Sequence, residues 1–105
     1  MIISIKLKHF EAKNGGRYGP YFVGEEAEWR ARNKPHPNQA KIVGIDIEGG
    51  KLRPGKAALI NIVPLVSESW TKLAIGDKLY LMNIDVVCGE AKILAFKKSI
   101  PVFGG

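Results

Sequence analysis

The period-two alternation of apolar and polar residues is the feature that most constrains what this chain can fold into. In residues 3–8, an isoleucine or a leucine stands at every odd position, and a serine or a lysine stands at every even position. Successive side chains of a β-strand point to opposite faces, so this pattern predicts a strand with one buried face. About six segments of this kind are joined by short turns, and no segment is a convincing amphipathic helix. The sequence therefore predicts an antiparallel β-sandwich or β-barrel.

The connections between these segments contain the residues that turns require. Asn14-Gly15-Gly16 can adopt positive φ angles at little steric cost, and Pro54-Gly55 matches the central pair of a type II turn. Two prolines within residues 33–38 predict a polar loop there. Residues 67–75 are expected to be irregular, with room for one helical turn. The expected strands are 3–8, 20–32, 43–47, 56–66, 79–82 and 86–96.

The alternation also predicts which side chains form the core. We expect one domain in residues 1–96, followed by a tail at 97–105 that is poorly ordered unless it packs against the domain. The predicted buried residues are Ile3, Ile5, Val43, Ile45, Leu59, Leu81 and Ile93, together with Tyr21, Val23 and Trp29 from the second strand.

Composition narrows the environment and the partners. The 105 residues carry a net charge of +6, which suits an anionic partner such as nucleic acid or an acidic protein surface. No apolar run reaches the roughly 20 residues that span a bilayer, so no membrane association is expected. The opening residues lack the order of a secretory signal, and the single cysteine, Cys88, cannot form an intramolecular disulfide. These features predict a cytoplasmic protein.

Three patterns that suggest chemistry have simpler structural interpretations. Residues 50–57 have the glycine spacing of a P-loop, yet Ala57 stands where a hydroxyl should coordinate magnesium, so no nucleotide is expected. Cys88 lies within a predicted strand and is expected to be a small buried residue, not a nucleophile. The only histidines are His9 and His36, so the sequence predicts neither a metal site nor a cofactor.

Arginine and aromatic residues stand together in two segments. Arg17 and Tyr18 occupy a glycine-rich turn, and Arg30 and Arg32 follow Trp29 along one strand. Arginine is costly to bury, and arginine and tyrosine are enriched in binding hot spots. We therefore predict that Arg17, Tyr18, Arg30 and Arg32 bind a partner. Replacing Arg17 and Tyr18 with alanine is expected to weaken that binding and to leave thermal stability nearly unchanged.

Several of these motifs occur in a recognisable order. The turn Gly15-Gly16-Arg17 precedes the aromatic strand start Pro20-Tyr21-Phe22, Pro54-Gly55 precedes a long apolar strand, and Gly89 lies in the closing hairpin. In this order the motifs resemble the C-terminal (third) β-barrel domain of elongation factor Tu and related translation GTPases, over roughly residues 2–96. The resemblance implies that residues 1–96 form a six-stranded antiparallel Greek-key barrel.

The resemblance also implies possible partners. In elongation factor Tu this domain contributes to the groove for the T-stem of aminoacyl-tRNA and contacts the GTPase domain and the exchange factor. Arg17 matches a position that touches tRNA. Residues 82–86 replace a basic hairpin of that family, and Val63 replaces a residue that is commonly basic or polar. Most of the RNA-contacting chemistry is therefore missing.

These observations lead to three hypotheses of different classes. The first is a non-enzymatic barrel that binds a protein; its most specific form is a mimic of elongation factor Tu that acts as a neutralising or immunity-type protein against a toxin. The second is an RNA-binding module, for tRNA in particular, that uses Arg17, Arg30 and Arg32 with Lys6 and Lys8. The third is a small enzyme built on Cys88.

Overall fold

The computed structural model describes residues 1–11, 17, 19–31 and 38–98. Strands make up most of this part of the chain, as the alternation predicts. The elements are β1 (Ile2–His9), β2 (Tyr21–Phe22), β3 (Glu26–Ala31), β4 (Asn38–Asp46), β5 (Lys51–Leu52), β6 (Ala57–Pro64), the 3-10 helix η2 (Ser67–Trp70), β7 (Lys78–Asn83) and β8 (Val86–Lys97).

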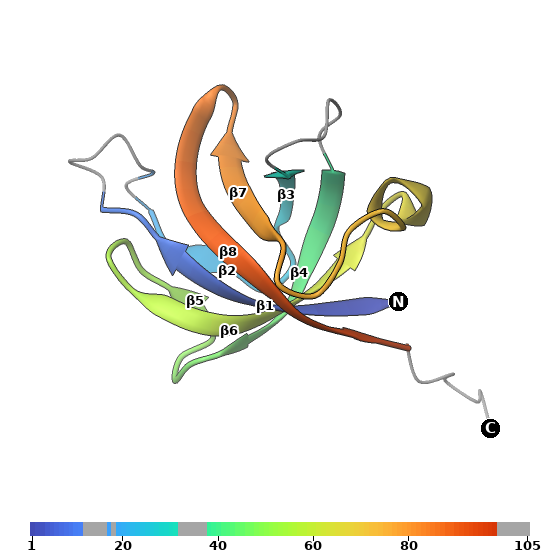
Figure 1. The fold of residues 1–105 in the computed structure, drawn as a ribbon. Coiled ribbons are helices and arrows are strands. Elements are labelled where there is room, and N and C mark those ends of the chain that lie inside the picture. Colours follow the sequence, from blue (N-terminus) through green and yellow to red (C-terminus); the bar gives the residue numbers. More distant parts are fainter. Residues whose placement is uncertain (12–16, 18, 32–37, 99–105) are drawn as a thin grey trace.

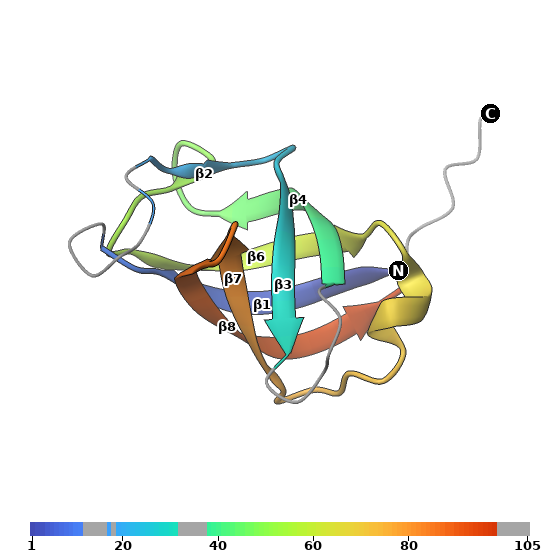
Figure 2. The same ribbon diagram turned by 90° about the horizontal axis from the view of Figure 1, so that it is seen from above.

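Six of these strands form a closed antiparallel barrel in the order β1-β6-β4-β3-β7-β8 (Figure 1). The ring closes because the long strand β8 pairs with β7 and also with β1. The two short strands β2 and β5 pair with each other, and β2 lies outside the ring of long strands (Figure 2). The prediction of an all-β fold and a closed six-stranded antiparallel barrel is confirmed.

The barrel interior contains the inward-facing residues of each strand. Leu7 in β1, Trp29 in β3 and Ile62 in β6 have no exposed surface. A closed ring of strands buries one face of every strand in the same core, so half of each alternating segment points inward. Of the residues predicted to be buried, the structure confirms Ile3, Ile5, Tyr21, Trp29, Leu81 and Ile93, and it places Ile45 partly buried against the core.

The predictions that Val23, Val43 and Leu59 are buried are wrong, because these residues are 51%, 41% and 48% exposed. In β4 a β-bulge lies between Ile42 and Gly44, and it moves the following residues to the opposite face. The inward residue at this point is therefore Ile42. Leu59 faces outward because β6 alternates like the other strands, although both of its faces carry apolar residues. No element covers the outer side of β6 at Leu59 in the part of the chain that the structure describes.

The predicted second strand, 20–32, is two strands separated by a bend at Gly24. Gly24 has a φ of 100°, which favours glycine, and its amide donates to the carbonyl of Ile42 at 2.7 Å. The amide of Ile42 donates in turn to the carbonyl of Glu25 at 2.8 Å. The chain therefore leaves the two-stranded sheet after Phe22 and enters the barrel wall at Glu26.

Two local predictions agree with the structure. Gly55 has a φ of 84°, and the amide of Lys56 donates to the carbonyl of Arg53 at 3.1 Å, as in a type II turn. Residues 67–75 contain one short 3-10 helix, and its last residue, Trp70, is buried. In the predicted polar loop, Asn38 is instead the first residue of β4, whereas residues 33–37 lie outside the described part, as does the tail from 99 onward. Among the described residues, no helix is long and apolar enough to cross a membrane.

Candidate functional site

Arg17 makes several contacts within the protein. Its guanidinium donates to the carbonyl of Pro20 at 2.6 Å and forms an ion pair with Glu25, in which Nη1 and Oε1 are 2.8 Å apart. The same group lies over the ring of Tyr21, 4.1 Å from the ring centroid. Burial lowers the pKa of Arg17, but the hydrogen bond and charge of Glu25 outweigh this effect, so its pKa is raised. Arg17 therefore stabilises the segment that leads into β2.

The residues beneath Arg17 form a buried cluster. The ring of Tyr21 packs edge-on against His9, with centroids 4.9 Å apart, and His9 Nε2 donates to the carbonyl of Gly19 at 2.9 Å. Burial, followed by the nearby thiol of Cys88, raises the pKa of Tyr21 to about 12. Cys88 is itself buried, and its thiol donates to the carbonyl of Val86 at 3.6 Å. These contacts hold Tyr21, His9 and Cys88 together inside the protein, and among the described residues Nδ1 of His9 is buried without a hydrogen-bond partner.

Among the other predicted partner-binding residues, the structure describes Arg30, which does not join Arg17 in a single site. Arg30 lies on the outer face of β3, and its Nε donates to Glu28 at 2.9 Å. It stands opposite Tyr80 of β7, whereas the partners of Arg17 are Pro20, Glu25 and Tyr21. Tyr18 and Arg32 lie outside the described residues.

The β7–β8 hairpin ends in an apolar tip, which we define as Ile84, Val86 and Val87. These side chains are 84%, 46% and 37% exposed. Asn83 pairs with Val86, so Ile84 and Asp85 form a two-residue turn, and Ile84 has a φ of 57°. A β-branched residue with this φ is a conformational outlier, because such turns normally contain glycine or asparagine. The sequence could have indicated this strained turn, because an isoleucine stands in a two-residue hairpin turn at a position that favours glycine.

Four lysines surround a hollow on the outer wall of the barrel. We call it the lysine hollow; its lining includes Lys6 and Lys8 of β1, Lys78 of β7 and Lys92 of β8, and its volume is about 310 Å³. Lys92 stands directly opposite Lys6 on one side and directly opposite Lys78 on the other. Like charges in directly opposite positions destabilise a sheet. Oε1 of Glu90 lies 3.8 Å from Nζ of Lys78. Within the described part of the chain, no ion pair involves Lys6, Lys8 or Lys92.

Neither the buried cluster nor the two surfaces resemble a metal centre. Across residues 1–11, 17, 19–31 and 38–98, no three histidine, cysteine or carboxylate side chains are grouped as metal ligands. Comparison with models of protein families and with curated proteins finds no match for this sequence.

Proposed function

We propose that this protein is a non-enzymatic β-barrel binding module and that its partner is another protein. The observation that carries the proposal is Ile84, which is 84% exposed and has a φ of 57°. A backbone outlier of this kind costs on the order of 1–3 kcal/mol. An exposed side chain returns little of that free energy by packing. Burial of the isoleucine against a partner would contribute roughly 1.5–3 kcal/mol, which is comparable to the cost.

The surroundings of Ile84 support a protein partner over a small molecule. Val86 and Val87 extend the apolar surface, and the tip projects from the end of a hairpin, as Figure 1 shows. A projecting apolar residue fits a pocket on a partner, which is the arrangement typical of interface anchors. The buried Cys88 supports a non-enzymatic role, because a shielded thiol does not meet a substrate.

The finer form of the proposal is a mimic of the third domain of elongation factor Tu, acting in the cytoplasm as a neutralising or immunity-type protein against a toxin directed at that factor. The order of the turn and glycine motifs supports it, and a closed six-stranded barrel is the architecture that the resemblance requires. The apolar tip lies where that family has a basic hairpin. This difference favours a protein partner over tRNA.

The test compares the tagged wild-type chain with Ile84→Gly in a pull-down from native lysate, with each bound protein quantified. Ile75 provides a matched control, because it is an isoleucine in another turn and is 67% exposed. We expect at least one stoichiometric partner that is depleted by Ile84→Gly and retained by Ile75→Gly. No stoichiometric partner under several growth conditions, or equal recovery by both variants, would contradict the proposal.

The lysine hollow supports RNA binding as a second candidate function. Lys6, Lys92 and Lys78 stand in one row across three neighbouring strands, and lysines in this arrangement can contact successive phosphates. We expect tRNA affinity to fall steeply with salt, and the salt slope to decrease by about 1 for each lysine changed to glutamine. If tRNA does not bind at about 50 mM salt, where phosphate contacts are strong, RNA binding is excluded.

A further inference from the structure

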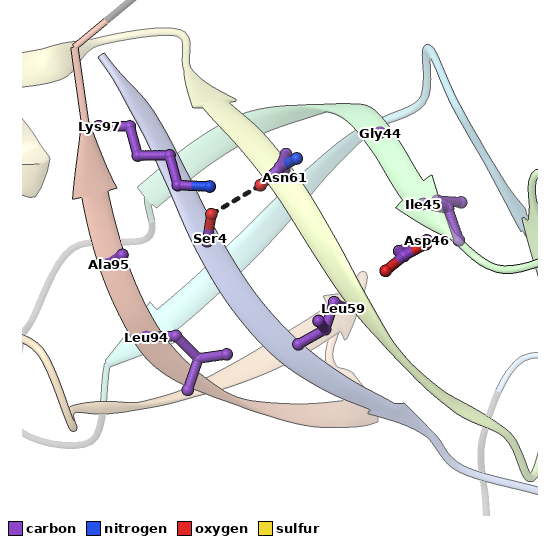
Figure 3. Close-up of a pocket in the computed structure, with 9 residues that line it drawn as sticks. All are labelled: Ser4, Gly44, Ile45, Asp46, Leu59, Asn61, Leu94, Ala95 and Lys97. Atoms are coloured by element: carbon purple, nitrogen blue, oxygen red, sulfur yellow. Dashed lines mark hydrogen bonds between the residues drawn. The ribbon is translucent and has the colours of Figure 1, made fainter.

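A second and larger hollow lies on the outer wall of the barrel, over strands β8, β1, β6 and β4 (Figure 3). We call it the outer groove; its volume is about 570 Å³, which is within the range of ligand sites. Its lining combines polar, charged and apolar side chains. Those that matter for recognition are Ser4, Asp46, Leu59, Asn61, Leu94 and Lys97.

Two β-bulges flank the groove. In β8, Leu94 is the extra residue between the pairs Ser4–Ala95 and Ile5–Ile93. The bulge in β4 leads to Gly44, which stands opposite Asn61. A β carbon added to Gly44 would lie 3.5 Å from the amide nitrogen of Asn61, so the absence of a side chain leaves this amide uncovered. Bulges bend strands and redirect side chains, and they often occur beside binding sites.

The floor of the groove presents one donor group beside one acceptor. The hydroxyl of Ser4 donates to Oδ1 of Asn61 at 2.7 Å, and this bond orients the amide (Figure 3). Within the described residues, Nδ2 of Asn61 has no hydrogen-bond partner, so its two hydrogens remain for a ligand. The hydroxyl oxygen of Ser4 retains lone pairs that can accept. A donor next to an acceptor complements one residue of an extended peptide, whose backbone C=O and N–H point to the same side.

Opposite charges lie at the two sides of the groove. Asp46 is on β4 and Lys97 is on β8, with β1 and β6 between them. Three strand spacings of about 4.8 Å separate their backbones by roughly 14 Å across the sheet. The register sets them about four residues, or roughly 13 Å, apart along the sheet, because Asp46 is level with Lys6 of β1 and Lys97 is level with Ile2. Five residues of extended peptide at about 3.3 Å each, with long charged side chains at both ends, can bridge the resulting diagonal of roughly 19 Å. An amino acid carries both charges on one carbon and is too short for this span. The exposed Leu59 and Leu94 offer contact to an apolar residue between the charges.

We propose that the outer groove binds a short extended peptide segment, with a cationic group at Asp46, an anionic group at Lys97 and the backbone N–H and C=O of one residue on Ser4 and Asn61. A peptide cannot extend the barrel sheet, because all six strands are paired on both sides. Recognition of its backbone therefore depends on side chains such as Asn61. This site is separate from the β7–β8 tip, so it does not depend on protein binding by that tip.

The test is an NMR titration of the 15N-labelled protein with a blocked pentapeptide of sequence Lys-Ala-Leu-Ala-Glu, whose first, third and fifth side chains share one face of the extended chain. The side-chain NH₂ signals of Asn61 report on the groove directly. We expect these signals and the backbone amides of Ser4 and Leu94 to shift and saturate. Blocked Lys-Ala-Leu-Ala-Lys and Glu-Ala-Leu-Ala-Glu each lack one of the two charges and should bind more weakly.

Three variants test the roles of the groove residues, with heteronuclear spectra as the control for folding. Asp46→Asn and Lys97→Gln should each weaken binding about two- to fivefold, as expected for exposed ion pairs. Asn61→Asp has nearly the same shape but removes both donors, so affinity should fall at least tenfold. Lys41→Gln changes an exposed lysine of β4 outside the groove and should bind like wild type. The proposal is overturned by the absence of saturable shifts at millimolar peptide, by equal binding of the three peptides, or by wild-type affinity of Asn61→Asp.

Discussion

The conformation of Ile84 leads to an unusual stability prediction: a glycine in its place should not destabilise the protein. A left-handed conformation costs an L-residue roughly 1–2 kcal/mol, and glycine removes this cost. Glycine increases the entropy of the unfolded chain, which costs about 0.4–1 kcal/mol. Because Ile84 is 84% exposed, only about a sixth of its surface is in contact, which is worth about 0.3 kcal/mol. The net expectation is a gain of about 0.5 kcal/mol.

Ile75→Gly gives the matched comparison. Ile75 is also exposed, but its φ is not positive, so glycine brings the entropic cost without relief of strain. About a third of the surface of Ile75 is in contact, which adds about 0.7 kcal/mol to that cost. We expect Ile75→Gly to lose about 1–1.7 kcal/mol, which makes the two variants differ by about 1.6–2.2 kcal/mol. Urea unfolding followed by the fluorescence of the buried Trp29 and Trp70 measures both values. If Ile84→Gly is destabilised as much as Ile75→Gly, the inference of strain is refuted, and with it the main support for a binding tip.

Three further predictions concern the strands and the buried cluster. A β carbon at Gly89 would lie 2.6 Å from the carbonyl oxygen of Lys8, so Gly89→Ala should lower the free energy of unfolding by at least 1–3 kcal/mol. Gly44→Ala is the control: its β carbon would make no contact under 3.5 Å, so its effect should be nearly neutral. Arg17→Ala should cost about 0.5–2 kcal/mol, because it removes an ion pair and the stacking on Tyr21. An unchanged melting temperature would contradict this and would agree with the prediction made from sequence. The pKa of Tyr21 is about 12 in the folded protein against 10 in the unfolded chain, so the unfolded chain loses this proton first. The free energy of unfolding should therefore fall between pH 10 and 12. Tyr21→Phe should reduce that fall, and equal pH profiles of the two proteins would refute the prediction.

The residues that sequence analysis placed correctly are those whose environment depends on the local pattern alone. Ile3 and Ile5 are buried because every second residue of β1 faces the core, and Gly55 has the positive φ that a Pro-Gly turn requires. Val43 and Leu59 were misplaced for different reasons. At Val43 a bulge changes the register, and a bulge depends on the neighbouring strand. At Leu59 a run of apolar residues conceals which face is inward.

The candidate surfaces were harder to predict because they form between strands far apart in sequence. Lys6, Lys78 and Lys92 become neighbours only when β8 pairs with both β1 and β7. The outer groove likewise requires four strands and two bulges. Arg17 illustrates a different difficulty: arginine next to tyrosine suggested an interface, and the structure adds an ion pair between Arg17 and Glu25. Composition alone does not distinguish an arginine that binds a partner from one that stabilises its own loop.

The two features that folding alone does not explain lie on the same hairpin. Ile84 is at its end, and Lys78 and Lys92 face each other near its base. Six residues of strand separate Lys78 from Ile84, or roughly 20 Å at about 3.3 Å per residue, and a typical protein interface of about 800 Å² per partner can cover both. A protein with an apolar pocket and an acidic patch would thus bury the exposed Ile84 and neutralise the repulsion among the lysines. RNA would relieve only the repulsion among the lysines. Ile84→Gly should therefore leave tRNA binding unchanged if RNA is the ligand, whereas both Ile84→Gly and Lys92→Gln should weaken binding if the ligand is a protein.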